Sequence, residues 1–170
     1  PENVGKMILG LPTFLPATPN GIIELLKRYN IPTSGKNTVV VGRSNIVGRP
    51  ISILMSLRGK YGNSTVTLAH SKTKNLIDLT QKADIIIMAL GIPEFLKSHM
   101  IKNDSTVIDV GITRVEDKSK KRGYSIKGDV DFDSVSKKVK FLTPVPGGVG
   151  PMTIAMLLQN TLDARLWDLS

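Results

Sequence analysis

A glycine turn that carries a basic and a hydroxyl side chain is the segment of this sequence best suited to bind an anion. Val39–Val41 run into Gly42, and the segment GRSNIVG continues with Arg43, Ser44 and Gly48. A strand that leads through such a turn into a helix directs backbone N–H groups to one point, where the helix dipole adds positive charge. Gly42 would permit the turn, Gly48 would let the helix approach the strand, and Ser44 could donate its hydroxyl to a phosphate oxygen. Because the spacing departs from G-x-G-x-x-G, a plain turn of an α/β protein is the alternative.

The end of the following strand indicates which dinucleotide would bind. In NAD-binding folds, an acidic residue about 20 positions after the first glycine holds the ribose hydroxyls. The corresponding segment here, TVTLAHSKTKN, offers His70, Ser71, Lys72 and Lys74 and no carboxylate. The planar guanidinium of Arg43 suits a phosphate dianion, and Ser71 supplies a second donor. The sequence therefore favours NADP over NAD, with a capped or solvated loop at Ser71 and Lys72 as the alternative.

The net charge of +9 comes from one part of the chain. No aspartate or glutamate lies between Glu24 and Asp78. That interval holds nine basic residues, which are Lys27, Arg28, Lys36, Arg43, Arg49, Arg58, Lys60, Lys72 and Lys74. The other 14 basic residues balance the 14 acidic ones, so this interval is either a solvated basic face or an anion site. A nucleic-acid partner is disfavoured, because aromatic-rich strand motifs and zinc ligands are absent and aromatic residues make up only 5 %.

Strand-like and helix-like segments alternate along the chain and would position these residues. We expect strands over residues 38–41, 64–69, 84–90, 105–110 and 140–143. We expect helices over residues 46–58 and 73–82, and a helical turn over 94–99. The run DIIIMAL at 84–90 is typical of a strand buried on both faces. The fold class predicted is α/β, a Rossmann-like doubly wound parallel sheet with helices on both faces.

Three regions follow from this pattern. Residues 1–17 contain three prolines without clean periodicity, and we interpret them as a connector. Residues 18–150 form the expected dinucleotide-binding domain, whose first helix begins with Thr18 as N-cap. A polar hairpin or loop is expected over 115–128. Residues 151–170 are expected to be a closing helix.

A later strand end would complete the cofactor site. In open parallel sheets, ligands lie beyond the carboxyl ends of the strands at the switch point. Gly111 and Ile112, in the segment IDVGITR, could therefore line the nicotinamide half, whereas we favour a buried, hydrogen-bonded carboxylate for Asp109. PVPGGVGP at 144–151 must be a loop, which either borders the cleft or is a plain crossover.

Composition excludes several other classes of protein. No apolar run is long enough to cross a bilayer, and the chain does not open on a basic-then-apolar leader. Cysteine is absent, which excludes disulfides and thiolate metal sites and fits a reducing compartment. We therefore expect a cytoplasmic protein with no metal, no membrane and no nucleic-acid partner.

Seven segments together resemble the bifunctional methylenetetrahydrofolate dehydrogenase/methenyltetrahydrofolate cyclohydrolase family. They are FLPATPNGIIELL, GKNTVVVGRSNIVGRP, TVTLAHSKT, ADIIIMALG, VIDVGITR, GDVDF and TPVPGGVGPMTIAMLLQNT. The resemblance implies NADP-dependent oxidation of methylene-tetrahydrofolate and hydrolysis of the methenyl product to formyl-tetrahydrofolate, in one-carbon metabolism. It also implies a homodimer paired through this domain. The NADP contacts that it implies fall on Gly42, Arg43, Ser44, Ser71 and Ile112.

The same resemblance implies that the folate pocket and a catalytic lysine belong to an N-terminal domain, in a Tyr-x-x-x-Lys motif that is absent here. Tyr124 and Lys127 have the wrong spacing and are interpreted as solvated, and His70 and His99 as structural. No catalytic residue is therefore assigned. The chain is expected to bind NADP and to catalyse neither reaction without the folate domain. A stand-alone regulatory dinucleotide-binding module and an NADP reductase completed by a partner chain are the alternatives.

Overall fold

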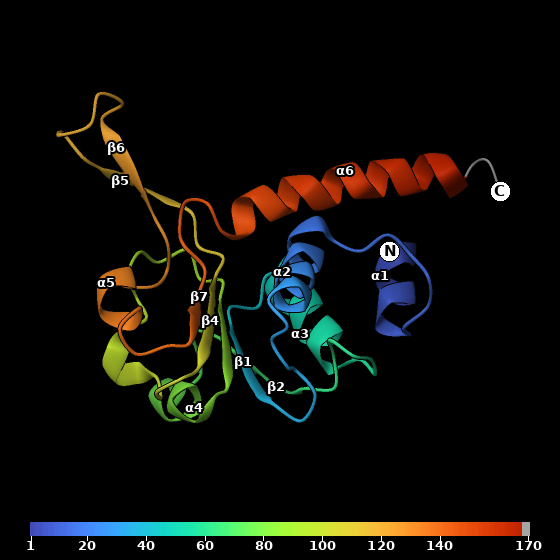
Figure 1. The fold of residues 1–170 in the computed structure, drawn as a ribbon, viewed down its shortest axis with the longest axis horizontal. Helices are drawn as coiled ribbons and strands as arrows, with labels where there is room; N and C mark the ends of the chain where they lie inside the picture. Colours follow the sequence, from blue (N-terminus) through green and yellow to red (C-terminus); the bar gives the residue numbers. More distant parts are fainter. Residues whose placement is uncertain (168–170) are drawn as a thin grey trace.

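Five parallel strands form the central sheet of the computed structural model, which describes residues 1–167 (Figure 1). Their spatial order is β2-β1-β3-β4-β7. Their bounds are Asn37–Val41 for β1, Thr65–Ala69 for β2, Ile85–Met88 for β3, Thr106–Asp109 for β4 and Phe141–Leu142 for β7. The strand order extends from β1 to β2 on one side and from β1 to β3 on the other, so the switch point lies between β1 and β3.

Alternate side chains of the strands enter two separate apolar cores, one on each face. Val40 and Ile87 belong to the first core and Val39 and Ile86 to the second. The first face is covered by α1 (Glu2–Ile8), α2 (Ala17–Arg28), α3 (Gly48–Ser56) and the start of α6 (Val149–Trp167). The second face is covered by α4 (Leu76–Lys82), the 3₁₀ helix η1 (Ser98–Met100) and α5 (Phe132–Val135). The prediction of a doubly wound parallel sheet is confirmed.

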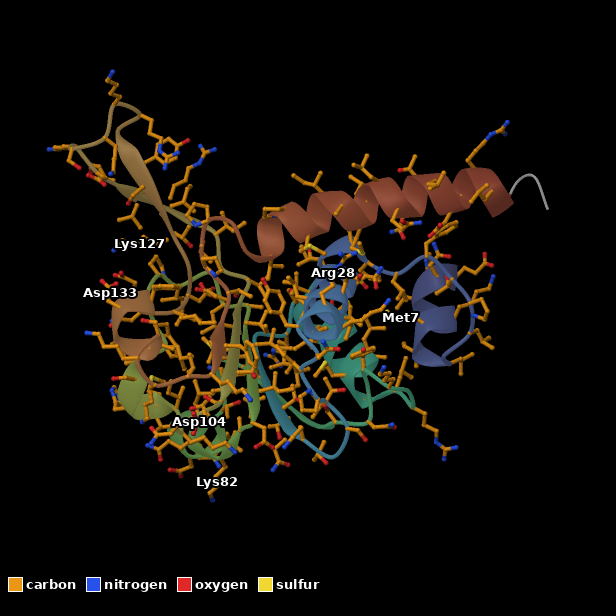
Figure 2. All side chains as sticks on the ribbon, viewed as in Figure 1. Met7, Arg28, Lys82, Asp104, Lys127 and Asp133 are labelled. Atoms are coloured by element: carbon orange, nitrogen blue, oxygen red, sulfur yellow. The ribbon has the colours of Figure 1, made fainter. Side chains whose placement is uncertain are left out.

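The first seventeen residues differ from the expected connector. They contain α1, whose Met7 is buried, and Figure 2 shows Met7 on the side of α1 that faces the rest of the chain. The next helix, α2, begins at Ala17, so the prediction of Thr18 as N-cap is wrong. The hydroxyl of Thr18 lies instead 2.9 Å from that of Thr153 on α6.

The closing helix begins earlier than expected. It starts at Val149, so the loop predicted over 144–151 ends at Gly148. Pro151 lies in its first turn, where backbone N–H groups have no acceptor within the helix, so the lack of an N–H in proline costs no hydrogen bond. Residues 168–170 of the expected helix lie outside the described residues. Of the helical turn predicted over 94–99, the structure has only the 3₁₀ helix η1, which begins at Ser98. The short helix α5 was not predicted.

One side of α6 packs along α2, and the other is open. The amide of Asn20 contacts the sulfur of Met156 at 3.3 Å, and Asn160 donates to the carbonyl of Leu15 at 2.9 Å. Figure 2 shows side chains that project from α6 away from the rest of the ribbon. Five apolar side chains of α6 are more than half exposed, namely Ile154, Leu157, Leu158, Leu162 and Leu166. Throughout the described part of the chain, none of the helices combines the length and apolar character needed to cross a membrane.

An antiparallel hairpin, predicted over 115–128, projects beside the sheet (Figure 1). It consists of β5 (Thr113–Glu116) and β6 (Tyr124–Lys127). At its base, Lys127 Nζ lies 2.7 Å from Glu94 Oε1, which ties the hairpin to the loop after β3. The hairpin is therefore anchored next to the carboxyl edge of the sheet.

Candidate functional site

The turn after β1 needs glycine at two positions. Gly42 has a φ of +119°, and a Cβ atom there would overlap the carbonyl oxygen of Ala89 at the end of β3. A Cβ atom at Gly48 would overlap the carbonyl oxygen of Gly42. The first turn of α3 therefore lies directly against the end of β1, beside the switch point.

Four consecutive backbone amides line this turn without a partner. The N–H groups of residues 43–46 donate no hydrogen bond within residues 1–167, and all four residues are exposed. Successive free amides in a turn that leads into a helix form a concave anion site. Sequence reasoning identified Arg43 and Ser44 but did not single out the amides of Asn45 and Ile46, because main-chain donors leave no signal in residue type.

The side chain of Ser44 has a structural task in this turn. Its Oγ accepts hydrogen bonds from the amides of Val47 (3.1 Å) and Gly48 (3.2 Å), which are the first free donors of α3. Two helix amides are thus satisfied by Ser44 rather than left for a ligand. The hydroxyl proton of Ser44 has no acceptor among the described residues, so it is still able to bond to a phosphate oxygen.

The loops that carry Arg43 and Ser71 leave the sheet side by side. Val41 and Ala69 are register partners on neighbouring strands, and Gly42 N donates to the carbonyl of Ala69 at 2.9 Å. Both loops therefore begin one strand spacing apart, about 4.8 Å. Arg43 is exposed and forms no ion pair within residues 1–167, so its charge is available to an anion at this edge.

A tight turn after β2 presents Ser71 and Lys72 to solvent. Thr73 N donates to the carbonyl of His70 at 2.8 Å, and His70 N donates to Thr73 Oγ1 at 3.0 Å. Lys72 N donates to His70 Nδ1 at 3.2 Å, which gives His70 the structural place expected for it. No carboxylate follows β2 before Asp78, so nothing acidic opposes a phosphate at this turn.

Ile112 lies at the opposite end of the same edge. It follows β4, is 64 % exposed, and its Cδ1 lies 3.8 Å from the position of a Cβ on Gly150. Together with Ile126, the loop 144–148 and the first residues of α6, it lines a pocket of about 250 Å³. β2 and β4 are separated by three strand spacings, about 14 Å, so the sequence-predicted residues form one row along the edge rather than one compact cluster.

Asp109 at the end of β4 is the buried, hydrogen-bonded carboxylate that the sequence favoured. It is 3 % exposed and accepts from the amides of Gly111, Asp129 and Val130, each at 2.9 Å. Burial raises the pKa of Asp109 to about 6, since desolvation, helped by the nearby Asp129 charge, outweighs the three amide donors.

This pKa predicts an unusual pH dependence of stability. Because the pKa of Asp109 is higher in the folded state than its usual 3.8, folding favours the protonated form. Its contribution to the free energy of unfolding is greatest below pH 4 and falls by about 3 kcal/mol as the pH rises through 6. Urea denaturation of the chain and of Asp109→Asn between pH 4.5 and 7.5 checks this. The unaltered chain should lose its advantage in the free energy of unfolding over Asp109→Asn as the pH rises. A difference that does not change with pH would contradict the raised pKa of Asp109.

The tyrosine and lysine of β6 are not placed for proton transfer. Glu94 raises the pKa of Lys127 through a hydrogen bond, so Lys127 stays a cation and is unsuited to accept a proton. The centre of the Tyr124 ring lies 4.9 Å from the guanidinium carbon of Arg114 and 5.0 Å from that of Arg122. Both residues are half-buried and have local partners, whereas the sequence predicted that they would be solvated.

A parallel sheet with a glycine turn, free amides and a basic loop at its switch point defines the class of dinucleotide-binding Rossmann-like domains. The sequence matches the tetrahydrofolate dehydrogenase/cyclohydrolase family, NAD(P)-binding domain, over residues 16–168. The chain belongs to this family.

Relatives of known name agree with this assignment. The chain is 68 % identical over 165 residues to the bifunctional protein FolD of Flavobacterium johnsoniae, covering 97 % of this chain and 56 % of that protein. Its structure matches FolD methylenetetrahydrofolate dehydrogenase/cyclohydrolase from Campylobacter jejuni with a TM-score of 0.87 and 51 % identity, covering 96 % of this chain and 55 % of that one. It matches the Trypanosoma brucei methylenetetrahydrofolate dehydrogenase-cyclohydrolase, solved with NADP cofactor and inhibitor, with a TM-score of 0.88 and 40 % identity, covering 95 % and 55 %. The chain thus spans about half the length of these relatives.

Proposed function

We propose that this chain binds NADP along the carboxyl edge of its sheet. The pyrophosphate would bind the free amides of residues 43–46, and the 2′-phosphate would lie between Arg43 and Ser71. The nicotinamide would lie toward Ile112 and the loop 144–148. The bound cofactor would supply a hydride acceptor, and the chain's own residues would hold and orient it.

One observation carries the proposal: four exposed amides, which have no partner within residues 1–167, lie beside a basic loop without carboxylates. In this fold, an acidic side chain at the end of β2 would bind the ribose hydroxyls of NAD and repel a 2′-phosphate. The Trypanosoma brucei relative is known in complex with NADP, which agrees with this preference.

Titration calorimetry tests the proposal. We expect NADP to bind at least about 30-fold more tightly than NAD, because a charge-assisted hydrogen bond to the additional phosphate is worth about 2 kcal/mol. Adenosine 2′,5′-bisphosphate, which lacks the nicotinamide half, should also bind. Equal affinities for NADP and NAD would contradict the placement of the 2′-phosphate.

We further propose that the chain is the cofactor-binding part of an enzyme that oxidises methylene-tetrahydrofolate and hydrolyses the methenyl product. The exposed apolar side of α6 would then be covered by the folate-binding part of that enzyme. This part would supply the substrate pocket and the group that activates water. Pairing of two copies through the cofactor domain belongs to the same proposal, which rests on the family membership.

Mixing this chain with the N-terminal part of the Flavobacterium johnsoniae relative distinguishes the cofactor-binding part of an enzyme from a regulatory dinucleotide-binding module. We expect the chain alone to show neither activity and the mixture to reduce NADP when methylene-tetrahydrofolate is present. Binding of NADP without any recovered activity would favour a module that acts without catalysis.

A further inference from the structure

Two carboxylates that make none of the proposed cofactor contacts are buried behind the carboxyl edge of the sheet. Asp109 ends β4, and Asp129 follows β6 in the segment GDVDF. Asp109 is 3 % exposed and Asp129 is fully buried. Burying two carboxylates is costly, and an apolar pair is commonly as stable, so their presence calls for a task beyond packing.

Asp129 holds the loop that follows β3. Its Oδ2 accepts from Leu90 N at 2.6 Å and from Gly91 N at 3.0 Å. Gly91 has a φ of +73° and lies past the last residue of β3, so the sheet itself does not fix it. These two amides lie beyond the strand and have no acceptor in the sheet, and the carboxylate accepts their hydrogen bonds instead.

Asp109 fixes Asp129 and the loop that follows β4. It accepts from Asp129 N and Gly111 N through Oδ1, and from Val130 N through Oδ2. A Cβ atom at Gly111 would overlap Asp129 Oδ1, and one at Gly128 would overlap Asp109 Oδ2. The carboxylates and these glycines therefore fit together with no room to shift.

The two loops held in this way lie on one side of the switch point. β3 and β4 are adjacent, and the loops after them include Leu90, Gly91 and the exposed Ile112. Arg43 and Ser71 follow β1 and β2, and none of the hydrogen bonds of Asp109 or Asp129 reaches either loop. Asp129 Oδ1 is buried without a hydrogen-bond partner among the described residues, so the hydrogen bonds of this side chain all run through Oδ2 to the loop after β3.

We propose that Asp129, supported by Asp109, is a positioning residue for the nicotinamide half of the cofactor, an inference that rests on the proposed NADP binding. It acts through the backbone of the loops after β3 and β4 and touches neither the cofactor nor the reacting atoms. The adenosine half, on β1 and β2, is independent of it.

Comparing NADP with adenosine 2′,5′-bisphosphate on Asp129→Ala tests the proposal. Loss of the carboxylate frees Leu90 N and Gly91 N, and we expect NADP to bind about tenfold more weakly, because small misplacements of a binding group are costly. The bisphosphate should bind within about twofold of its original affinity. Asp129→Asn keeps an acceptor oxygen for the two amides and should restore most of the NADP affinity. Asp133→Ala, on the exposed side of α5 (Figure 2), removes the same charge and should change neither affinity.

The outcomes separate the two proposals. If the unaltered chain binds neither ligand, the proposed function fails. If it binds both and Asp129→Ala weakens both equally or neither, the positioning role is wrong. It is equally wrong if Asp129→Asn behaves like Asp129→Ala.

A measurement on the unaltered chain keeps the proposal testable if Asp129→Ala does not fold. The amide hydrogens of Leu90 and Gly91 should exchange slowly with solvent, although they lie in a loop, because the buried carboxylate holds them. Exchange at the rate of an open loop would overturn the proposal.

Discussion

Replacing Arg43 by alanine is expected to weaken NADP binding about 50-fold while NAD binding changes less than about threefold. Arg43 is exposed, has no ion-pair partner within residues 1–167, and follows a strand whose neighbour β2 leads into a loop without carboxylates before Asp78. Its loss removes the charged donor for the 2′-phosphate but leaves the amides of the turn in place. Calorimetric titration of both dinucleotides measures the change.

Arg58→Ala is the matched control for this prediction. Arg58 is an exposed arginine in the same acid-free interval, just beyond the last residue of α3. Its replacement by alanine removes the same charge as Arg43→Ala. If it weakens NADP binding as much as Arg43→Ala, general attraction by the basic interval would explain the affinity. A specific contact between Arg43 and the 2′-phosphate would then be excluded.

Replacing Gly48 by alanine is expected to cost about 3 kcal/mol or more in the free energy of unfolding. The added Cβ would overlap the carbonyl oxygen of Gly42, a backbone atom that cannot rotate away as a side chain does. Separation of α3 from β1 would also weaken the contact of Gly48 N with Ser44 Oγ. Such a loss is a large share of the stability of an ordinary domain, and denaturant unfolding measures it.

Gly5→Ala provides the comparison. Gly5 also lies in a helix, on an exposed site with nothing within 4 Å of an added Cβ. Alanine there should be neutral or stabilising by up to about 1 kcal/mol. Similar effects at both positions would show that close approach of α3 to β1 is not required.

The central strands could be predicted because their burial leaves a plain pattern. β3 and β4 are buried along their whole length, so their residues are mostly apolar, and these runs stand out from the segments between them. The parallel sheet with helices on both faces follows from this alternation, whereas the strand order β2-β1-β3-β4-β7 is known only from the structure. Helix ends were less well predicted, because they depend on contacts with distant segments.

Three particular differences illustrate this limit. The helix α1 has no clean apolar period and is held by the burial of one residue, Met7. Thr18 has the residue type of an N-cap, but its hydroxyl pairs with Thr153, 135 positions away. The glycines of PGGVGP suggested a loop, although α6 begins inside that segment.

For the candidate site, the sequence pointed to side chains and missed the backbone donors. Arg43, Ser71 and Ile112 carry distinctive types after successive strands, so they could be placed on one edge. Asp129 escaped notice as a positioning residue, since an aspartate after a hairpin is usually solvated. The one available signal was its neighbour Gly128, which leaves the space that Asp109 Oδ2 occupies.

The amides of residues 43–46, which have no partner in the described part of the chain, belong to the polypeptide backbone and not to any side chain. An ordinary substitution at these positions keeps the N–H group, and only proline deletes it. If these amides bind the pyrophosphate as proposed, substitution of Arg43 could change the preference between NADP and NAD without removing the donors for the pyrophosphate that both share. In such a domain, preference for a cofactor can drift within few mutational steps, whereas the capacity to hold a dinucleotide is inherited with the fold.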